Sequence, residues 1–295
     1  MKYDIEADWL LLNTCNYTCR YCYRPVEKLR ERIRVAGGIG DIVGFFNESG
    51  LTWLLHITGG EPLVYPQFVE LCQELTQEHF ISLNSNVSLR NVIDFARTVP
   101  PTRVSFVHCG LHIEQRERRD AVPDFINHVD LLQDHGFRVM VSYVMCPDLF
   151  GRFQADFDFF LANGIVLIPK ALQGSHHGKL YPASYTPDQR QAFLSYSLRA
   201  EEQFARLKGT CWPPPTINLF LDRNLVQHGR SDYRGMPCNA GYTFVRIREN
   251  GDIQRCGARD VLGNVVGGVF DRRTGPSMCN EFQCPYFCVK YVIPA

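Results

Sequence analysis

Residues 14–23 read Thr-Cys-Asn-Tyr-Thr-Cys-Arg-Tyr-Cys-Tyr, directly after the apolar segment Trp9–Leu12 and Asn13. The stretch places Cys15, Cys19 and Cys22 on one short loop with C-x3-C-x2-C spacing. Three thiolates so spaced can ligate three corners of a cubic iron–sulfur cluster and leave the fourth iron open for chemistry. A closed zinc site needs a fourth protein ligand, and no His or Cys follows at zinc-finger spacing. Structural zinc or a disulfide scaffold stays as the alternative.

A second motif, Thr58-Gly59-Gly60-Glu61-Pro62, follows the apolar run Leu54–Ile57. Its two glycines allow a close approach of backbone to a ligand, and Glu61 offers only acceptors, as an ammonium partner should. The two motifs in this order resemble the signatures of the radical S-adenosylmethionine (radical SAM) enzymes, C-x3-C-x-aromatic-C with Tyr21 in the aromatic position, and G-G-E-P. In that family G-G-E-P follows the second barrel strand and holds the amino group of S-adenosylmethionine.

The resemblance implies a set of cofactors and contacts. A [4Fe-4S] cluster held by the three cysteines binds S-adenosylmethionine through its open iron. One electron, from an external donor such as flavodoxin or ferredoxin, cleaves the sulfonium to a 5′-deoxyadenosyl radical. This radical removes hydrogen from a substrate C–H bond, while the protein positions the cofactor and excludes water. The expected S-adenosylmethionine contacts are Tyr21, Gly59, Gly60, Glu61, Pro62, Asn84, Ser85, Asn86 and, less directly, Ser105 and Ser142.

The amino-acid composition limits the classes of protein to which this chain can belong. The chain has 295 residues, 45% of them hydrophobic, and equal numbers of basic and acidic residues, 31 each. This balance argues against a general nucleic-acid or membrane-surface binder. Residues 1–6 carry charges and no apolar core, so no signal peptide is expected, and no apolar run reaches the length of a membrane span. The 12 cysteines gather mainly near the two ends, which favours metal over disulfides and predicts a cytoplasmic protein.

The first two thirds of the chain alternate strand-like and helix-like stretches. Strand-like runs occur at Trp9–Asn13, Thr52–Ile57, Phe80–Asn84, Arg103–Val107, Arg138–Val144 and Ile165–Pro169. Helix-like stretches include Gln67–Glu78, Asp124–Asp134, Arg152–Ala162 and Pro187–Leu207. Gly136 and Gly164 follow the second and third of these just before a strand, as C-terminal caps should. Such alternation predicts a parallel sheet with right-handed crossovers. Six units suit an open, partial (β/α)6 barrel of the α/β class, which is the core that the radical SAM resemblance implies. Both motifs then fall at carboxyl ends of strands, where such sheets bind ligands.

The character of the chain changes after residue 208. Cys211 and the prolines at 213–215 interrupt regular structure, so we predict a barrel at 1–208 and a small cysteine-rich domain at 209–295. Residues 242–248 and 253–256 around Asn250-Gly251 predict a β-hairpin. The cysteines of this region are Cys238, Cys256, Cys279, Cys284 and Cys288. Their arrangement resembles the SPASM and twitch extensions of radical SAM enzymes, in the form with one auxiliary [4Fe-4S] cluster. Structural zinc is the alternative, and which of the last three cysteines are ligands stays open.

Further candidates follow later strands. Cys109 and Cys146 come after the fourth and fifth strand-like runs and are candidate hydrogen-atom donors, although buried cysteines are more often inert. Polar residues at the strand ends are candidates for reading a substrate; they are His108, His112, Glu114, Lys170, His176 and His177. The run Glu114–Asp120 mixes charges of both signs and is interpreted as an exposed helix face.

Three functions compete. A small-molecule enzyme would oxidise or epimerise a polyol, sugar or aminoglycoside-like substrate, with the auxiliary cluster accepting the electron of the substrate radical. A maturase would modify a ribosomal precursor peptide. The barrel is expected to begin almost at residue 1, which leaves no leader-binding domain before it and slightly favours the small molecule. The third reading, an iron–sulfur electron-transfer or scaffold protein, predicts no dependence on S-adenosylmethionine, against which G-G-E-P argues.

Overall fold

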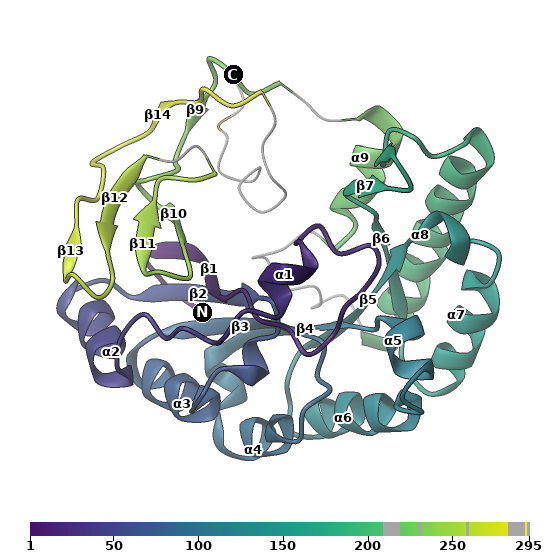
Figure 1. Cartoon of the computed structure of the whole chain (residues 1–295), viewed down its shortest axis with the longest axis horizontal. Coiled ribbons are helices and arrows are strands. Elements are labelled where there is room, and N and C mark those ends of the chain that lie inside the picture. The colour runs from purple at the N-terminus through teal and green to yellow at the C-terminus, as the bar shows by residue number, and fades with distance from the viewer. Residues whose placement is uncertain (209–218, 230–231, 258–259, 283–292, 294–295) are drawn as a thin grey trace.

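The computed structural model describes residues 1–208, 219–229, 232–257, 260–282 and 293. Its centre is a ten-stranded sheet in the order β13-β12-β11-β10-β1-β2-β3-β4-β5-β6, curved so that helices cover its convex face (Figure 1). Strands β1 to β6 are parallel, as the alternating sequence predicts. Among the described residues the edge strands β13 and β6 do not pair, so the sheet is open and the prediction of a partial barrel is confirmed.

The parallel strands lie within a few residues of the predicted runs. They are β1 (Ile5–Leu12), β2 (Trp53–Gly59), β3 (Phe80–Ser85), β4 (Val104–Gly110), β5 (Val139–Met145) and β6 (Leu167–Ala171). The helices of this part are α1 (Val26–Leu29), α2 (Ile39–Glu48), α3 (Phe68–Glu78), α4 (Asn91–Thr98), α5 (Ile113–Glu117), α6 (Val122–Asp134), α7 (Phe153–Ala162), α8 (Pro187–Lys208) and α9 (Leu221–His228). No helix among the described residues has both the length and the apolar character needed to cross a bilayer.

Two helices end as predicted from their glycines. Gly136 and Gly164 have φ values of +84° and +74°, which glycine adopts without the steric cost that other residues meet. The amide of Phe137 bonds back to the carbonyl of Leu132, at 3.0 Å, and closes the last turn of α6. This is the Schellman pattern, and it turns the chain directly into the next strand.

The two faces of the sheet differ in chemistry. Tyr143 on β5 donates its hydroxyl to Asp156 of α7 at 2.7 Å, and Trp9 on β1 contacts Phe46 of α2, so these side chains face the helices. Neighbouring side chains of a strand alternate between faces. Asp8, His56 and Ser142 occupy the alternate positions and therefore lie on the opposite, inner face.

A buried polar chain crosses the inner face. The hydroxyl of Tyr3 donates to Glu6 at 2.5 Å, the other oxygen of Glu6 lies 3.0 Å from Nε2 of His56, and Nδ1 of His56 lies 2.6 Å from the hydroxyl of Ser82. Buried polar groups are tolerated only when they are hydrogen-bonded, so this chain fixes the order of β1, β2 and β3.

The C-terminal region adds strands to the same sheet. The predicted hairpin forms as β10 (Phe244–Ile247) and β11 (Asp252–Gln254), and β10 pairs in parallel with β1. Asp8 of β1 faces Arg246 of β10 across this junction, at 3.5 Å. The hairpin is followed by β12 (Val261–Asn264) and β13 (Val269–Phe270). The small pairs β7 (Gly174–His176) with β8 (Lys179–Tyr181), and β9 (Pro237–Cys238) with β14 (Ser277–Met278), stand apart from the sheet.

Candidate functional site

The loop of Cys15, Cys19 and Cys22 leaves the carboxyl end of β1. The amide of Cys15 donates to the carbonyl of Leu29 in α1 at 2.9 Å, and the amide of Cys22 donates to the carbonyl of Cys19 at 3.0 Å. All three thiols are partly exposed. Backbone hydrogen bonds within the loop and to α1 thus hold the loop in shape, and its cysteines are not fully buried.

The three thiols are placed to hold a positively charged metal centre. Burial raises the pKa of Cys15 to about 11, and burial together with the neighbouring thiols raises that of Cys19 to about 12. Three thiolates on one short loop need positive charge between them, which the irons of a cluster would supply.

Residues that follow β4 contact the cysteine loop. The hydroxyl of Tyr21 lies 2.9 Å from Nδ1 of His112, and the sulfur of Cys19 lies 3.5 Å from the same nitrogen. Burial lowers the pKa of His112 to about 4, so the ring is neutral near pH 7. Arg20 pairs with Glu114 in α5 at 2.8 Å. His112 and Glu114 belong to the group predicted to read a substrate, and the structure places them against the cysteine loop.

The G-G-E-P segment packs directly on the start of the cysteine loop. Gly60 donates to the carbonyl of Leu12 at 2.8 Å, and Glu61 donates to that of Thr14 at 2.9 Å. A Cβ on Gly60 would lie 2.1 Å from the oxygen of Thr14, and one on Gly59 would lie 2.4 Å from that of Leu12. The glycines are therefore required by the contact between the two motifs.

Glu61 lies at the centre of this contact. Its side chain is buried, and it accepts hydrogen bonds from the hydroxyl of Ser85 at 2.6 Å, the amide of Asn86 at 2.6 Å and the amide of Leu63 at 3.1 Å. Burial raises the pKa of Glu61, and these hydrogen bonds oppose the rise. Oxygen Oε2 accepts only from Asn86 among the described groups, so it retains a lone pair for an ammonium donor.

The loop after β3 joins the cysteine loop through amides. Asn86 donates to the side chain of Asn16 at 2.9 Å, and Asn16 donates to the hydroxyl of Ser88 at 2.8 Å. Asn84 is exposed on the inner face and donates to Thr58 at 3.2 Å. The predicted residues Asn84 to Asn86 thus gather with both motifs at one end of the sheet.

Arg116 was not singled out from the sequence, and the interpretation of Glu114–Asp120 as an exposed face is wrong for this residue. Its side chain is 1% exposed. The guanidinium donates to the carbonyls of Leu111 at 2.6 Å and Gly110 at 3.4 Å, and also to that of Asn86. A buried guanidinium that binds carbonyls from two loops holds those loops in register.

The other candidate residues lie farther from the motifs or in different environments. Cys109 pairs in register with Val141, which is on the same face as Tyr143, so Cys109 faces the helices and is fully buried. Ser105 is fully buried within β4, and Ser142 lies on the inner face of β5. Cys146 follows β5, and its sulfur lies 3.3 Å from Nε2 of His176.

Three of the C-terminal cysteines gather in one small buried cluster. Cys238 on β9, Cys256 after β11 and Cys279 after β14 pack with Ala240 and Phe244. The amide of Ala240 approaches the sulfur of Cys238 at 3.4 Å. The predicted ligands Cys284 and Cys288 lie outside the described residues.

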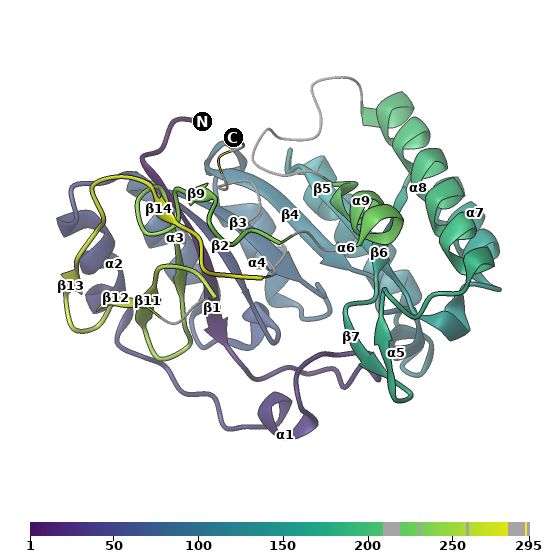
Figure 2. The same cartoon turned by 90° about the horizontal axis from the view of Figure 1, so that it is seen from above.

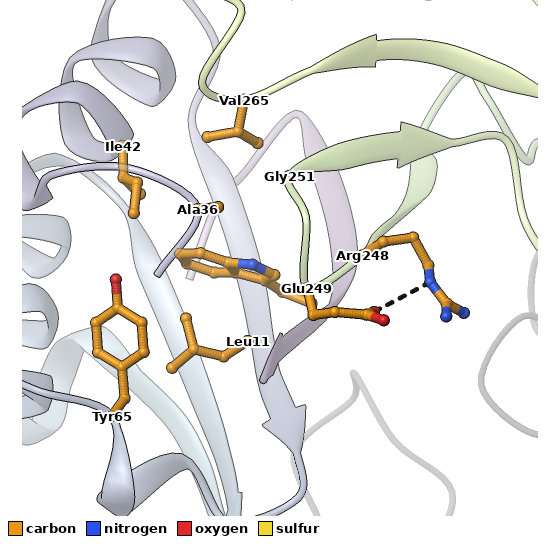
Figure 3. A pocket seen from close by; sticks show the side chains of 9 residues that line it. Leu11, Ala36, Ile42, Tyr65, Arg248, Glu249, Gly251 and Val265 are labelled. Carbon is orange, nitrogen blue, oxygen red and sulfur yellow. Dashed lines mark ion pairs between the residues drawn. The ribbon is translucent and has the colours of Figure 1, made fainter. Parts of the chain in front are cut away.

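A pocket elsewhere belongs to the junction of the sheet with the C-terminal hairpin (Figure 3). Its lining includes Trp9, Ile42 of α2 and Tyr65 on one side and Glu249 and Val265 on the other. Trp9 and Ile42 place it under the helices, on the opposite face from the inner polar groups. Its lining contains none of the predicted site residues.

Comparison with solved structures supports this architecture. Native anSMEcpe with bound AdoMet superposes with a TM-score of 0.59 at 16% identity, covering 89% of this chain and 78% of that one. The same protein with bound AdoMet and Kp18Cys peptide gives 0.60 at 15% identity, covering 89% and 78%. Streptococcus suis SuiB bound to precursor peptide SuiA gives 0.53 at 15% identity, covering 90% of this chain and 63% of SuiB. At these identities the likeness is one of fold.

Sequence comparison supplies the family. A search of curated proteins finds no match. The model of the radical SAM superfamily, however, matches residues 9–158, which contain the cysteine loop, G-G-E-P and strands β2 to β5. The chain therefore belongs to the radical SAM superfamily, whose enzymes use S-adenosylmethionine and a [4Fe-4S] cluster.

Proposed function

We propose that this radical SAM enzyme modifies a peptide substrate. Among the fold neighbours, anSMEcpe carries a bound peptide and SuiB carries a precursor peptide. Both superpose over about nine tenths of this chain, at 89% and 90%. This favours the peptide alternative over the polyol or sugar substrate that the sequence slightly favoured. The open sheet, whose described edges do not pair, is compatible with a substrate that extends beyond the barrel.

Each part of the site has an assigned role in this proposal. Cys15, Cys19 and Cys22 hold the cluster, and Glu61 receives the amino group of S-adenosylmethionine. When bound, the cluster and S-adenosylmethionine supply a 5′-deoxyadenosyl radical that takes a hydrogen atom from a substrate C–H bond. The polar side chains at the ends of β3, with Asn84 exposed on the inner face, hold the remaining polar groups of the cofactor. Tyr21 and His112 keep the cysteine loop in place and shield it from water.

The C-terminal module has a separate role. Cys238, Cys256 and Cys279 form a buried group, and we assign them to an auxiliary [4Fe-4S] cluster whose remaining ligand is Cys284 or Cys288. When bound, such a cluster would supply an acceptor for the electron of the substrate radical, which would make the net reaction an oxidation. The proposed division at 208/209 separates this module from the barrel, although β10 extends the barrel sheet.

The observation that carries the radical chemistry is the contact between the two motifs, made by the hydrogen bonds of Gly60 and Glu61 to the cysteine loop. The test of the peptide proposal uses anaerobically reconstituted enzyme with dithionite and S-adenosylmethionine. Short peptides encoded beside the gene are compared with a panel of polyols, sugars and aminoglycosides. We expect a peptide, and no member of the panel, to raise 5′-deoxyadenosine formation and to lose two hydrogen atoms by mass spectrometry. Turnover of a sugar, with every peptide inert, would contradict the proposal.

An experiment in deuterated solvent distinguishes oxidation of the peptide from its epimerisation. In deuterated buffer an oxidised peptide gains no carbon-bound deuterium, whereas an epimerised one acquires it from an exchangeable donor such as a thiol. We expect no deuterium, because the proposed auxiliary cluster removes an electron. Incorporation of deuterium would show that the reaction is an epimerisation and not an oxidation. The proposal of a peptide substrate would be unaffected.

A further inference from the structure

Beside the cysteine loop lies a second group of metal-binding side chains that the radical chemistry does not use. Cys146 and Asp148 follow β5, and His176 ends β7. Their ligand atoms all lie within 4.8 Å of one another. The sulfur of Cys146 is 3.3 Å from Nε2 of His176, and that nitrogen is 3.7 Å from an oxygen of Asp148.

These distances match those of ligands to a single ion. Zinc bonds of about 2.3 Å to sulfur and about 2.0–2.2 Å to nitrogen or oxygen, at tetrahedral angles, place the ligand atoms about 3.3–3.6 Å apart. The observed separations of 3.3 and 3.7 Å lie within a few tenths of an ångström of that range.

The local structure holds the group in place. Cys146 is 0% and His176 is 5% exposed, so two ligands are buried while Asp148 opens to solvent. His177 and Gly178, with φ values of +48° and +72°, form the tight turn between β7 and β8. The turn brings Nε2 of His177 to 3.7 Å from Asp148. Positive φ at both residues is what a two-residue hairpin turn of type I′ requires.

The group also lies next to the radical site. Arg20, the residue after Cys19, pairs with Asp148 at 2.8 Å. Figure 2 shows the hairpin of β7 and β8 and the helix α5 at the same end of the sheet. A ligand bound at Asp148 would therefore be separated from the cysteine loop only by the ion pair between Asp148 and Arg20, at the mouth of the barrel.

We infer that Cys146, Asp148 and His176 bind a divalent metal ion of the zinc class. One thiolate, one imidazole and one carboxylate form a borderline-soft set that suits this ion. Three protein ligands leave a fourth position, as in catalytic rather than structural zinc sites. The fourth ligand is then either His177 or an electron-pair donor of the substrate, such as a carboxylate, imidazole or thiolate. Cys146 is then a metal ligand and not a hydrogen-atom donor.

The experiment uses full-length enzyme with its clusters loaded, produced in medium with added zinc and desalted anaerobically. Metal analysis is expected to give about one zinc per chain in addition to iron, because the site binds one ion. X-ray absorption at the zinc edge is element-specific and is not disturbed by the iron clusters. It should show one sulfur neighbour at about 2.3 Å and the rest nitrogen or oxygen at about 2.0–2.2 Å.

Variants assign the site to these residues. Cys146→Ala and His176→Ala should each lower bound zinc at least about tenfold and leave iron unchanged. Each variant removes one of the three protein ligands of the ion. Cys72→Ala is the matched control, because Cys72 is a buried thiol inside α3, and it should retain the zinc. The wild-type absorption spectrum decides the question even where a variant does not fold. Zinc with only sulfur neighbours, zinc retained in Cys146→Ala, or no zinc in the wild-type enzyme would overturn the inference.

Discussion

The hydroxyl of Ser85 donates to the carboxylate of Glu61 at 2.6 Å, and this bond joins the end of β3 to the G-G-E-P segment. Because Glu61 also bonds the cysteine loop through its own amide, one residue connects three loops of the barrel mouth. The carboxylate is thus both the proposed partner of the S-adenosylmethionine amino group and a structural anchor. Substitutions of Glu61 and Ser85 distinguish the cofactor-binding role from the structural role.

Glu61→Gln should weaken S-adenosylmethionine binding about tenfold or more and leave iron content unchanged. A charge-assisted hydrogen bond contributes about 1.5–3 kcal/mol, and the variant removes the charge. Equilibrium binding under anaerobic conditions measures the change. Ser85→Ala is the control: it keeps the charge, loses one neutral donor and should lower stability by about 1 kcal/mol with a smaller effect on binding. Unchanged affinity in folded Glu61→Gln would remove this carboxylate from the cofactor site.

Gly60→Ala should prevent the close contact of the two motifs. The new methyl group would meet the backbone oxygen of Thr14 at 2.1 Å, and backbone cannot rotate away as a side chain can. We expect a loss of several kcal/mol in the free energy of unfolding, or a folded protein that no longer retains iron. Gly44→Ala in α2 is the matched control, since its methyl group meets nothing within 4 Å. It should be neutral or stabilise by about 0.5–1 kcal/mol. Equal stability of the two variants in chemical denaturation would contradict the packing described here.

Arg116→Met should destabilise the barrel mouth by about 2–4 kcal/mol, because it leaves buried carbonyls without a donor. Chemical denaturation measures this loss. Arg118→Met changes an exposed arginine of the same segment and should shift stability by less than about 0.5 kcal/mol. If the two substitutions cost the same, Arg116 does not hold the loops together.

The double change Cys238→Ala with Cys256→Ala should remove the proposed auxiliary cluster alone. We expect about four irons per chain in place of about eight, loosening of the C-terminal region and loss of peptide turnover. Cleavage of S-adenosylmethionine without substrate should persist, because the first cluster is untouched. Full iron content in this variant, or only about four irons in the wild-type enzyme together with zinc that the double variant loses, would make the C-terminal module structural.

Local patterns predicted the elements that depend on local physics. Gly136 and Gly164 end their helices in the left-handed conformation, and the turn at Asn250-Gly251 joins β10 to β11, because these preferences act within a few residues. The pairing of β10 with β1 was not predicted. It brings together segments more than two hundred residues apart, and nothing in either strand alone specifies the other.

The same limit applies to the site. The motif residues from Cys15 to Asn86 gather because they end neighbouring parallel strands, which the alternation of strands and helices predicts. Arg116 lies in a run of mixed charges that is typical of a solvated helix, and only the short α5 packed beneath the loops reveals its burial. Cys146 and His176 are thirty residues apart, so their contact depends on the hairpin that follows β6.

The central claim is that Cys15, Cys19 and Cys22 hold the cluster that cleaves S-adenosylmethionine. Its most direct test compares reconstituted wild-type enzyme with the triple variant Cys15→Ala, Cys19→Ala and Cys22→Ala, measuring iron and 5′-deoxyadenosine under dithionite. We predict that iron falls from about eight to about four per chain, while 5′-deoxyadenosine formation drops to background. Continued formation of 5′-deoxyadenosine by the triple variant would contradict the account.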